Sequence, residues 1–345
     1  MLVGTVFATG PAGLLAKLTG VAVTIVLPCV FIYYFLATLL PIDAIIARFY
    51  PLFGACLIIM ALGIMAGLLL GVGGHTMPEM TLANLHPAGA EKMPIWPLMF
   101  ITVACGAVSG FHSTQSPIMS RCLKDERLGR PVFYGAMISE GIIALIWATA
   151  GITFYDGTND LAAALKEGGP GTVVYTICVG LMGGDGSAFG YVGAVLAMLG
   201  VIACPITSGD TAFRSARLTL ADWIGVEQKV AAKRLMFAVP ILLTGGFLSQ
   251  IDFNIIWRYF SWTNQTLAMI VLWTGAVYLY RTKQGSSAYL IPAIPATFMS
   301  AVTFTYILQA PEGFKMDPSV TYPAGIVFAI ICVVLFAKAT LLSKK

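Results

Sequence analysis

Long runs of apolar residues, separated by short polar segments, cover most of the chain. A transmembrane helix needs about 20 consecutive, mostly apolar residues. Scanning for such runs gives nine segments, which are 20–40, 51–72, 97–115, 132–154, 172–206, 235–248, 255–280, 288–308 and 322–336. The sixth is short, and the fifth is long and interrupted by glycines. The pattern predicts an all-α polytopic membrane protein with about nine transmembrane helices.

Composition supports the same class. Of the 345 residues, 58% are hydrophobic and 10% are charged, and the mean hydropathy is +0.86. A soluble domain typically has about 25% charged residues, so this chain has too little charge to cover a water-facing surface. A soluble enzyme and a disordered chain are both excluded.

The basic residues orient the predicted helices. Fifteen of the 20 lysines and arginines fall in loops on one side of the nine spans, and four fall on the other side. Positive loops face the cytoplasm. We therefore expect the N-terminus outside, the C-terminus inside, and one transmembrane domain over residues 1–345.

The longest polar connection, 207–234, is predicted to be a cytoplasmic loop that contains an amphipathic helix. Phe213 and Trp223 share its apolar face, whereas Arg214 and Arg217 share another. Such a helix typically lies on the membrane with its arginines near lipid headgroups. The alternative is a regulatory or partner-binding role.

Polar residues at membrane depth are costly, and each is therefore a functional candidate. Two clusters are candidates for solute binding, and they comprise His112, Ser113, Thr114, Gln115, Arg258, Asn264 and Gln265. Hydroxyl, amide and guanidinium groups can bind a solute carboxylate. The structural alternatives are a helix cap with a satisfied histidine, and an interfacial arginine that anchors its helix beside Trp257 and Trp262.

Five further residues are candidates for ion coupling, and they are Glu140, Asp185, Thr207, Ser208 and Asp210. A desolvated carboxylate suits a proton carrier, and an unwound, glycine-rich segment at 183–190 would expose carbonyl groups to a cation. The alternatives are a structural partner for Glu140, an outer loop for Asp185 and a helix cap for Ser208 or Asp210.

Signals for other chemistry are weak. The three histidines and seven cysteines lack the spacing of metal ligands, and no catalytic or nucleotide-binding motif occurs. We therefore expect no enzyme activity, no cofactor, no metal and no nucleic-acid partner.

Several of the segments above resemble the carbon starvation protein A (CstA) family of bacterial inner-membrane transporters. They are FHSTQSP at 111–117, RPVFYGAM at 130–137 with Glu140 and Gly141, and the blocks 205–220 and 253–275. The resemblance implies uptake of peptides, or of pyruvate in some members, during nutrient starvation. It also implies part of the LeuT-like helix bundle of the amino acid–polyamine–organocation superfamily.

Family members are longer, and their N-terminal block has no counterpart here, so the chain is expected to begin several helices into the family pattern. The leading hypothesis is an inner-membrane secondary transporter that imports peptides or a small carboxylate, coupled to protons or sodium ions. The alternative is a non-transporting subunit or sensor that needs a partner membrane chain encoded separately.

Overall fold

The computed structural model describes residues 1–345 except 40–41, 80, 184–187, 284 and 341–345. The described residues are nearly all helical and contain no strand. The elements are α1 (Leu2–Thr19), α2 (Val23–Leu39), α3 (Ile42–Leu69), η1 (Val72–Gly74), α4 (Ile95–Ala107), α5 (Gly110–Cys122), η2 (Glu126–Leu128), η3 (Arg130–Gly135), α6 (Ala136–Phe154), α7 (Thr158–Gly183), α8 (Ala188–Ile224), α9 (Ala231–Leu248), α10 (Phe253–Thr282), η4 (Ser287–Tyr289), α11 (Leu290–Gln309) and α12 (Pro318–Ala339).

Six helical segments in the described part of the chain are long and apolar enough to cross a membrane. They are Leu2–Thr19, Pro51–Leu69, Glu126–Phe154, Ala231–Leu248, Ser287–Gln309 and Pro318–Ala339. The first was not among the nine predicted spans. The fold is therefore that of an all-α polytopic membrane protein, while the count of nine and the orientation stay predictions.

Two predicted spans are divided in the structure. The segment 172–206 belongs to two helices, because α7 ends at Gly183 and α8 begins at Ala188. The segment 97–115 is broken between α4 and α5.

The predicted loop 207–234 is also different, because α8 continues without interruption to Ile224. Its apolar face packs inside the protein only in part. Phe213 is buried and lies against the rings of Phe31 and Tyr34, whereas Trp223 near the end of α8 is 86% exposed. Arg217 is only 8% exposed and donates to Gln228 Oε1 over 3.0 Å. The cytoplasmic location of this segment stays a prediction.

The structure divides into two compact units, and the single transmembrane domain over 1–345 stays a prediction. Unit 1 is Met1–Pro87 with Ile138–Phe253, and unit 2 is Ala88–Met137 with Asn254–Lys345. In unit 1, α3, α7 and α8 form one core around side chains such as Met60, Ile177 and Met198. A second core joins α1, α2, α8 and α9 through Tyr34, Phe213 and Ile241.

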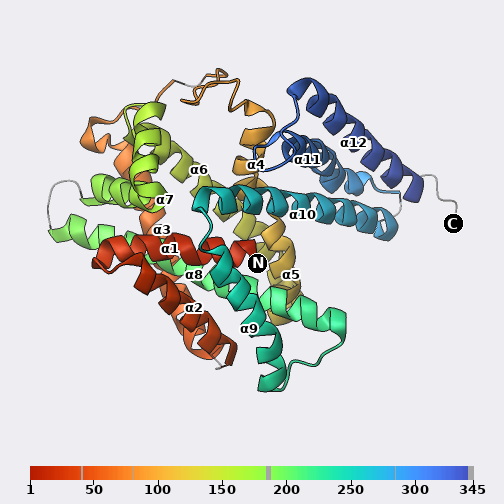
Figure 1. Cartoon of the computed structure of the whole chain (residues 1–345), viewed down its shortest axis with the longest axis horizontal. Helices are drawn as coiled ribbons and strands as arrows, with labels where there is room; N and C mark the ends of the chain where they lie inside the picture. Colours follow the sequence, from red (N-terminus) through yellow and green to blue (C-terminus); the bar gives the residue numbers. More distant parts are fainter. Residues whose placement is uncertain (40–41, 80, 184–187, 284, 341–345) are drawn as a thin grey trace. The chain divides into compact units, whose positions relative to one another are not determined.

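In unit 2, α11 and α12 lie side by side at the blue end of the chain (Figure 1). The core contains Ile101 of α4, Met269 of α10 and Val302 of α11. Asp317 caps α12 by accepting the Ser319 N–H over 2.8 Å. This hydrogen bond favours the ionised carboxylate and holds the pKa of Asp317 below its usual range.

Candidate functional site

The break between α4 and α5 is the central feature of unit 2. Each of the two helices has only 13 residues, which is too short to cross a bilayer alone. Ser109, the residue before α5, has an extended backbone (φ −128°, ψ 127°). The first amide groups of a helix have no partner within the helix. The start of α5 therefore needs hydrogen-bond acceptors from elsewhere.

Asn264 of α10 provides one of these acceptors. Its Oδ1 accepts the Phe111 N–H over 2.7 Å, and its Nδ2 donates to Ser109 Oγ over 3.2 Å. Asn264 is 4% exposed. A buried asparagine from one helix thus caps the first turn of another, 155 residues away from Ser109 in sequence.

The neighbouring Gln265 holds the other side of the break. It is fully buried, and its Nε2 donates to the Ile101 carbonyl of α4 over 3.4 Å. Two consecutive amide side chains of α10 therefore bind both halves of the interrupted helix. These are structural contacts, so Asn264 and Gln265, predicted to bind solute, bind the protein's own backbone here.

Gly110 lets α5 approach α10 closely. A Cβ at this position would meet the Asn264 carbonyl oxygen, and it would lie 2.8 Å from Leu267 Cβ and 3.0 Å from Ala268 N. Because two of these neighbours are backbone atoms, they cannot move aside like a flexible side chain. Position 110 therefore requires glycine.

We predict that Gly110→Ala destabilises the protein by about 1–3 kcal/mol, the usual cost of overpacking. The melting temperature of the purified protein in detergent measures this effect. Gly135→Ala is the matched control, since a Cβ at Gly135 meets nothing within 4 Å. Equal melting temperatures for Gly110→Ala and the wild type would contradict the close approach.

The first turns of α5 carry the other predicted solute ligands, His112, Ser113, Thr114 and Gln115, all half-buried. The Ser113 hydroxyl donates to Gly110 O over 2.5 Å, and the Thr114 hydroxyl donates to Phe111 O over 2.8 Å. Each hydroxyl has thereby used its hydrogen. The Thr114 Oγ1 also accepts from Gln115 Nε2 over 3.3 Å. The hydrogen of the Ser113 hydroxyl is committed to the backbone, so this group suits a solute's N–H or ammonium group better than a carboxylate.

Arg258 lies nearer the start of α10, and its partner is a carboxylate of the protein. Its Nε is 3.5 Å from Glu312 Oε2, with side-chain exposures of 41% for Arg258 and 5% for Glu312. The Tyr306 hydroxyl donates to Glu312 Oε1, and the Tyr259 hydroxyl donates to the Glu312 carbonyl over 2.8 Å. The short loop after α11 thus places a buried carboxylate against the predicted carboxylate-binding arginine.

In unit 1, three of the predicted coupling residues gather around Cys204 of α8. The Cys204 thiol forms a hydrogen bond with Ser208 and interacts electrostatically with Glu140 of α6. The Thr207 hydroxyl donates to the Cys204 carbonyl over 2.9 Å. Pro205 has no N–H to donate to the carbonyl four residues earlier, so this part of α8 lacks one helical hydrogen bond.

Asp210 is 6% exposed and forms an ion pair with Arg214 one turn later, at 2.9 Å between Oδ2 and Nη2. It also interacts electrostatically with Tyr34 of α2. Asp185, the fifth predicted coupling residue, lies outside the described residues. Of the predicted unwound segment 183–190, Gly183 ends α7 and 188–190 begin α8, and the rest lies outside the described residues.

The predicted residues thus separate by role. Those assigned to solute binding belong to unit 2, and the described ones assigned to ion coupling belong to unit 1. Sequence reasoning missed Glu312, Tyr306 and Cys204. An acidic residue just after an apolar run, as in Ala310-Pro311-Glu312, was the available signal for Glu312. The proximity of Cys204 to Glu140 has no sequence signal.

These observations define the class: a multi-pass, all-helical membrane protein with an interrupted helix. The sequence model described as carbon starvation protein CstA matches residues 1–168 and 158–306. The chain belongs to this family and is a multi-pass protein of the bacterial inner membrane.

Three relatives show how far the similarity extends. The peptide transporter CstA of Escherichia coli is 27% identical over 356 residues, covering 85% of this chain and 50% of the relative. An uncharacterized membrane protein of Haemophilus influenzae is 44% identical over 153 residues, covering 40% of this chain and 41% of the relative. The pyruvate/proton symporter BtsT of Escherichia coli is 35% identical over 120 residues, covering 33% of this chain and 16% of the relative.

The chain therefore spans about half the length of the Escherichia coli peptide transporter that it matches. No solved structure matches it.

Proposed function

We propose that the chain is the solute-binding and ion-coupling part of a secondary transporter that imports peptides or small carboxylates. The observation that carries this proposal is the interrupted helix α4–α5, held at both halves by the amides of Asn264 and Gln265. Discontinuous helices form the solute sites of many secondary transporters, because their ends expose backbone groups inside the bundle. Relatives named as a peptide transporter and as a pyruvate/proton symporter support the same class.

The chemistry of α5 favours peptides over pyruvate. The Ser113 hydroxyl has given its hydrogen to Gly110 O and can act only as an acceptor, which suits the ammonium group and amide N–H groups of a peptide, whereas pyruvate has no N–H. Arg258 lies on the same helix as Asn264, about 9 Å away along the axis of α10 at 1.5 Å per residue, and supplies a guanidinium. In this proposal it receives the peptide carboxylate, and Glu312 is the carboxylate that holds it when no solute is bound.

Glu140 is the residue we assign to coupling, with Thr207 and Ser208 beside it. Its carboxylate interacts electrostatically with the thiol of Cys204, the residue before Pro205. A carboxylate with hydroxyls and a carbonyl nearby can bind a proton or a sodium ion. Asp210 is already paired with Arg214, so we assign it a structural part.

The test is uptake by proteoliposomes that contain the purified chain. We expect an inward proton or sodium gradient to drive accumulation of a labelled dipeptide. Glu140→Gln should lose gradient-driven accumulation and keep exchange of labelled for unlabelled solute, because it removes the ion site and leaves the solute site. Glu126→Gln, which changes an exposed carboxylate in η2, is the control.

Accumulation by Glu140→Gln at the wild-type level would remove Glu140 from the coupling site. No uptake by the wild-type chain alone, with uptake after a second membrane chain is added, would favour the alternative of a subunit.

A further inference from the structure

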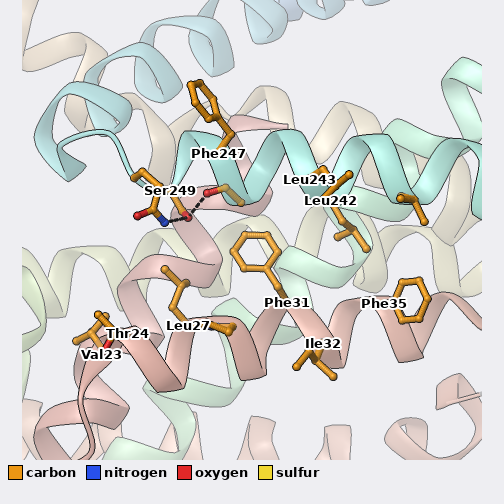
Figure 2. A pocket seen from close by; sticks show the side chains of 14 residues that line it. Val23, Thr24, Leu27, Phe31, Ile32, Phe35, Leu242, Leu243, Phe247 and Ser249 are labelled. Atoms are coloured by element: carbon orange, nitrogen blue, oxygen red, sulfur yellow. Dashed lines mark hydrogen bonds between the residues drawn. The ribbon is translucent and has the colours of Figure 1, made fainter.

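An open groove of about 770 Å³ runs between α2 and α9 of unit 1 (Figure 2). Most of its wall is apolar, and Leu27, Phe31, Phe35, Leu242 and Leu243 are typical of it. An exposed apolar surface as large as this groove is normally covered by a partner in the natural environment of the protein. Because this protein lies in a membrane, lipid surrounds its apolar outer surface, including this groove.

The groove has one polar end. Thr24, Ser249 and Gln250 line that end, near the first residue of α2 and beyond the last residue of α9. The Ser249 hydroxyl donates to Gly246 O over 2.6 Å, and Gln250 Nε2 donates to Ser249 Oγ over 3.3 Å, as the dashed lines in Figure 2 show. Because α9 is a candidate span that ends at Leu248, this polar end lies where the helix reaches the membrane surface.

The length of the groove fits one leaflet. From Thr24 to Phe35 the α2 side extends about 17 Å, at 1.5 Å per residue. One leaflet contributes about 15 Å to a hydrocarbon core of about 30 Å. A groove that is polar at the membrane surface, apolar over one leaflet and open along its side has the shape and polarity of a phospholipid with one acyl chain bound.

We propose that this groove is a binding site for a membrane phospholipid, with an acyl chain along Phe31 and Leu243 and the headgroup at Ser249 and Gln250. None of the 14 residues that line the groove is charged. An anionic headgroup therefore gains no ion pair from the lining, and the site suits a zwitterionic headgroup such as phosphatidylethanolamine. In the predicted orientation the site faces the outer leaflet.

Gly246 makes the proposal testable. It lines the groove, and a Cβ built there meets nothing within 4 Å. The first atom of a larger side chain therefore has room, and Gly246→Phe is expected to place its ring in the groove; replacing a helical glycine does not lower helix propensity. Gly151→Phe in α6 is the matched control, since a Cβ at Gly151 also meets nothing within 4 Å and this residue is not part of the lining.

The experiment uses the full chain in vesicles of phosphatidylethanolamine and phosphatidylglycerol. The probe is phosphatidylethanolamine with a photoreactive group in one acyl chain, and the labelled peptides are identified by mass spectrometry. We expect the label to concentrate on residues 23–35 and 239–247. Gly246→Phe should reduce it by about threefold or more, and Gly151→Phe should leave it unchanged, because only the first fills the cavity. A phosphatidylglycerol probe should label these peptides less.

Gly246→Leu is a smaller second variant, and elution as a single peak in detergent shows that each variant is folded. Three results would overturn the proposal. One is equal labelling of the wild type and both Gly246 variants. Another is label spread evenly over all lipid-facing helices. The third is a second protein that cross-links to residues 239–247 in place of the lipid. None of these outcomes depends on transport.

Discussion

Asn264→Ala is expected to abolish solute uptake in proteoliposomes at an unchanged level of expression. The substitution removes the acceptor of the Phe111 N–H and the donor to Ser109 Oγ. A buried N–H without a partner costs about 1–3 kcal/mol, and here that cost falls on the first turn of α5. We expect this turn to fray, so that Ser113 loses the backbone geometry that positions its hydroxyl for the proposed solute.

The control for this variant is Thr263→Ala. Thr263 precedes Asn264 on α10, is exposed, and donates its hydroxyl to Tyr259 O over 2.9 Å within its own helix. We expect normal uptake from Thr263→Ala. Uptake at the wild-type level by Asn264→Ala would show that the cap does not support the solute site.

Glu312→Gln is expected to lower the KM for a carboxylate solute by roughly fivefold, which corresponds to about 1 kcal/mol, the upper range for a partly exposed ion pair. The neutral amide can still accept from the Tyr306 hydroxyl, but it no longer attracts the Arg258 guanidinium. A solute carboxylate then meets less competition for Arg258. Initial rates of dipeptide uptake over a range of concentrations measure this effect.

Asp317→Asn is the control for the second prediction. It removes a carboxylate from the same loop, one that caps α12 through Ser319, and we expect an unchanged KM. Arg258→Gln should raise the KM. An unchanged or higher KM in Glu312→Gln would show that Glu312 and the solute do not compete for Arg258, and the pair would then be structural.

The membrane class can be predicted from the sequence because it depends on the composition of the chain and not on which helices pack together. The helix break was only partly predictable. Ser109 and Gly110 interrupt an apolar run too short to span a membrane, but the residue that caps the break is 155 positions away from Ser109. Polar residues at membrane depth can be found by scanning, whereas their partners depend on how the helices pack.

For the same reason, the partner of Arg258 could not be predicted from the sequence. Sequence alone leaves two interpretations, a carboxylate ligand and an interfacial anchor, because both need an arginine near the end of a helix. The structure adds the Glu312 carboxylate from the loop after α11. Likewise, residues 207–224 have the amphipathic pattern of a surface helix, and the partners of that apolar face, Tyr34 and Phe31, come from α2.

Pro205 gives α8 an unequal stiffness along its length. The helix has 37 residues and is therefore about 56 Å long, well beyond the hydrocarbon thickness of about 30 Å. A helix bends most easily where a proline removes one of its backbone hydrogen bonds. That point in α8 adjoins Cys204, beside Glu140. Binding of an ion beside Pro205, as proposed for Glu140, would change the charge at a point where α8 can bend, so a local change of charge would displace the far end of the helix.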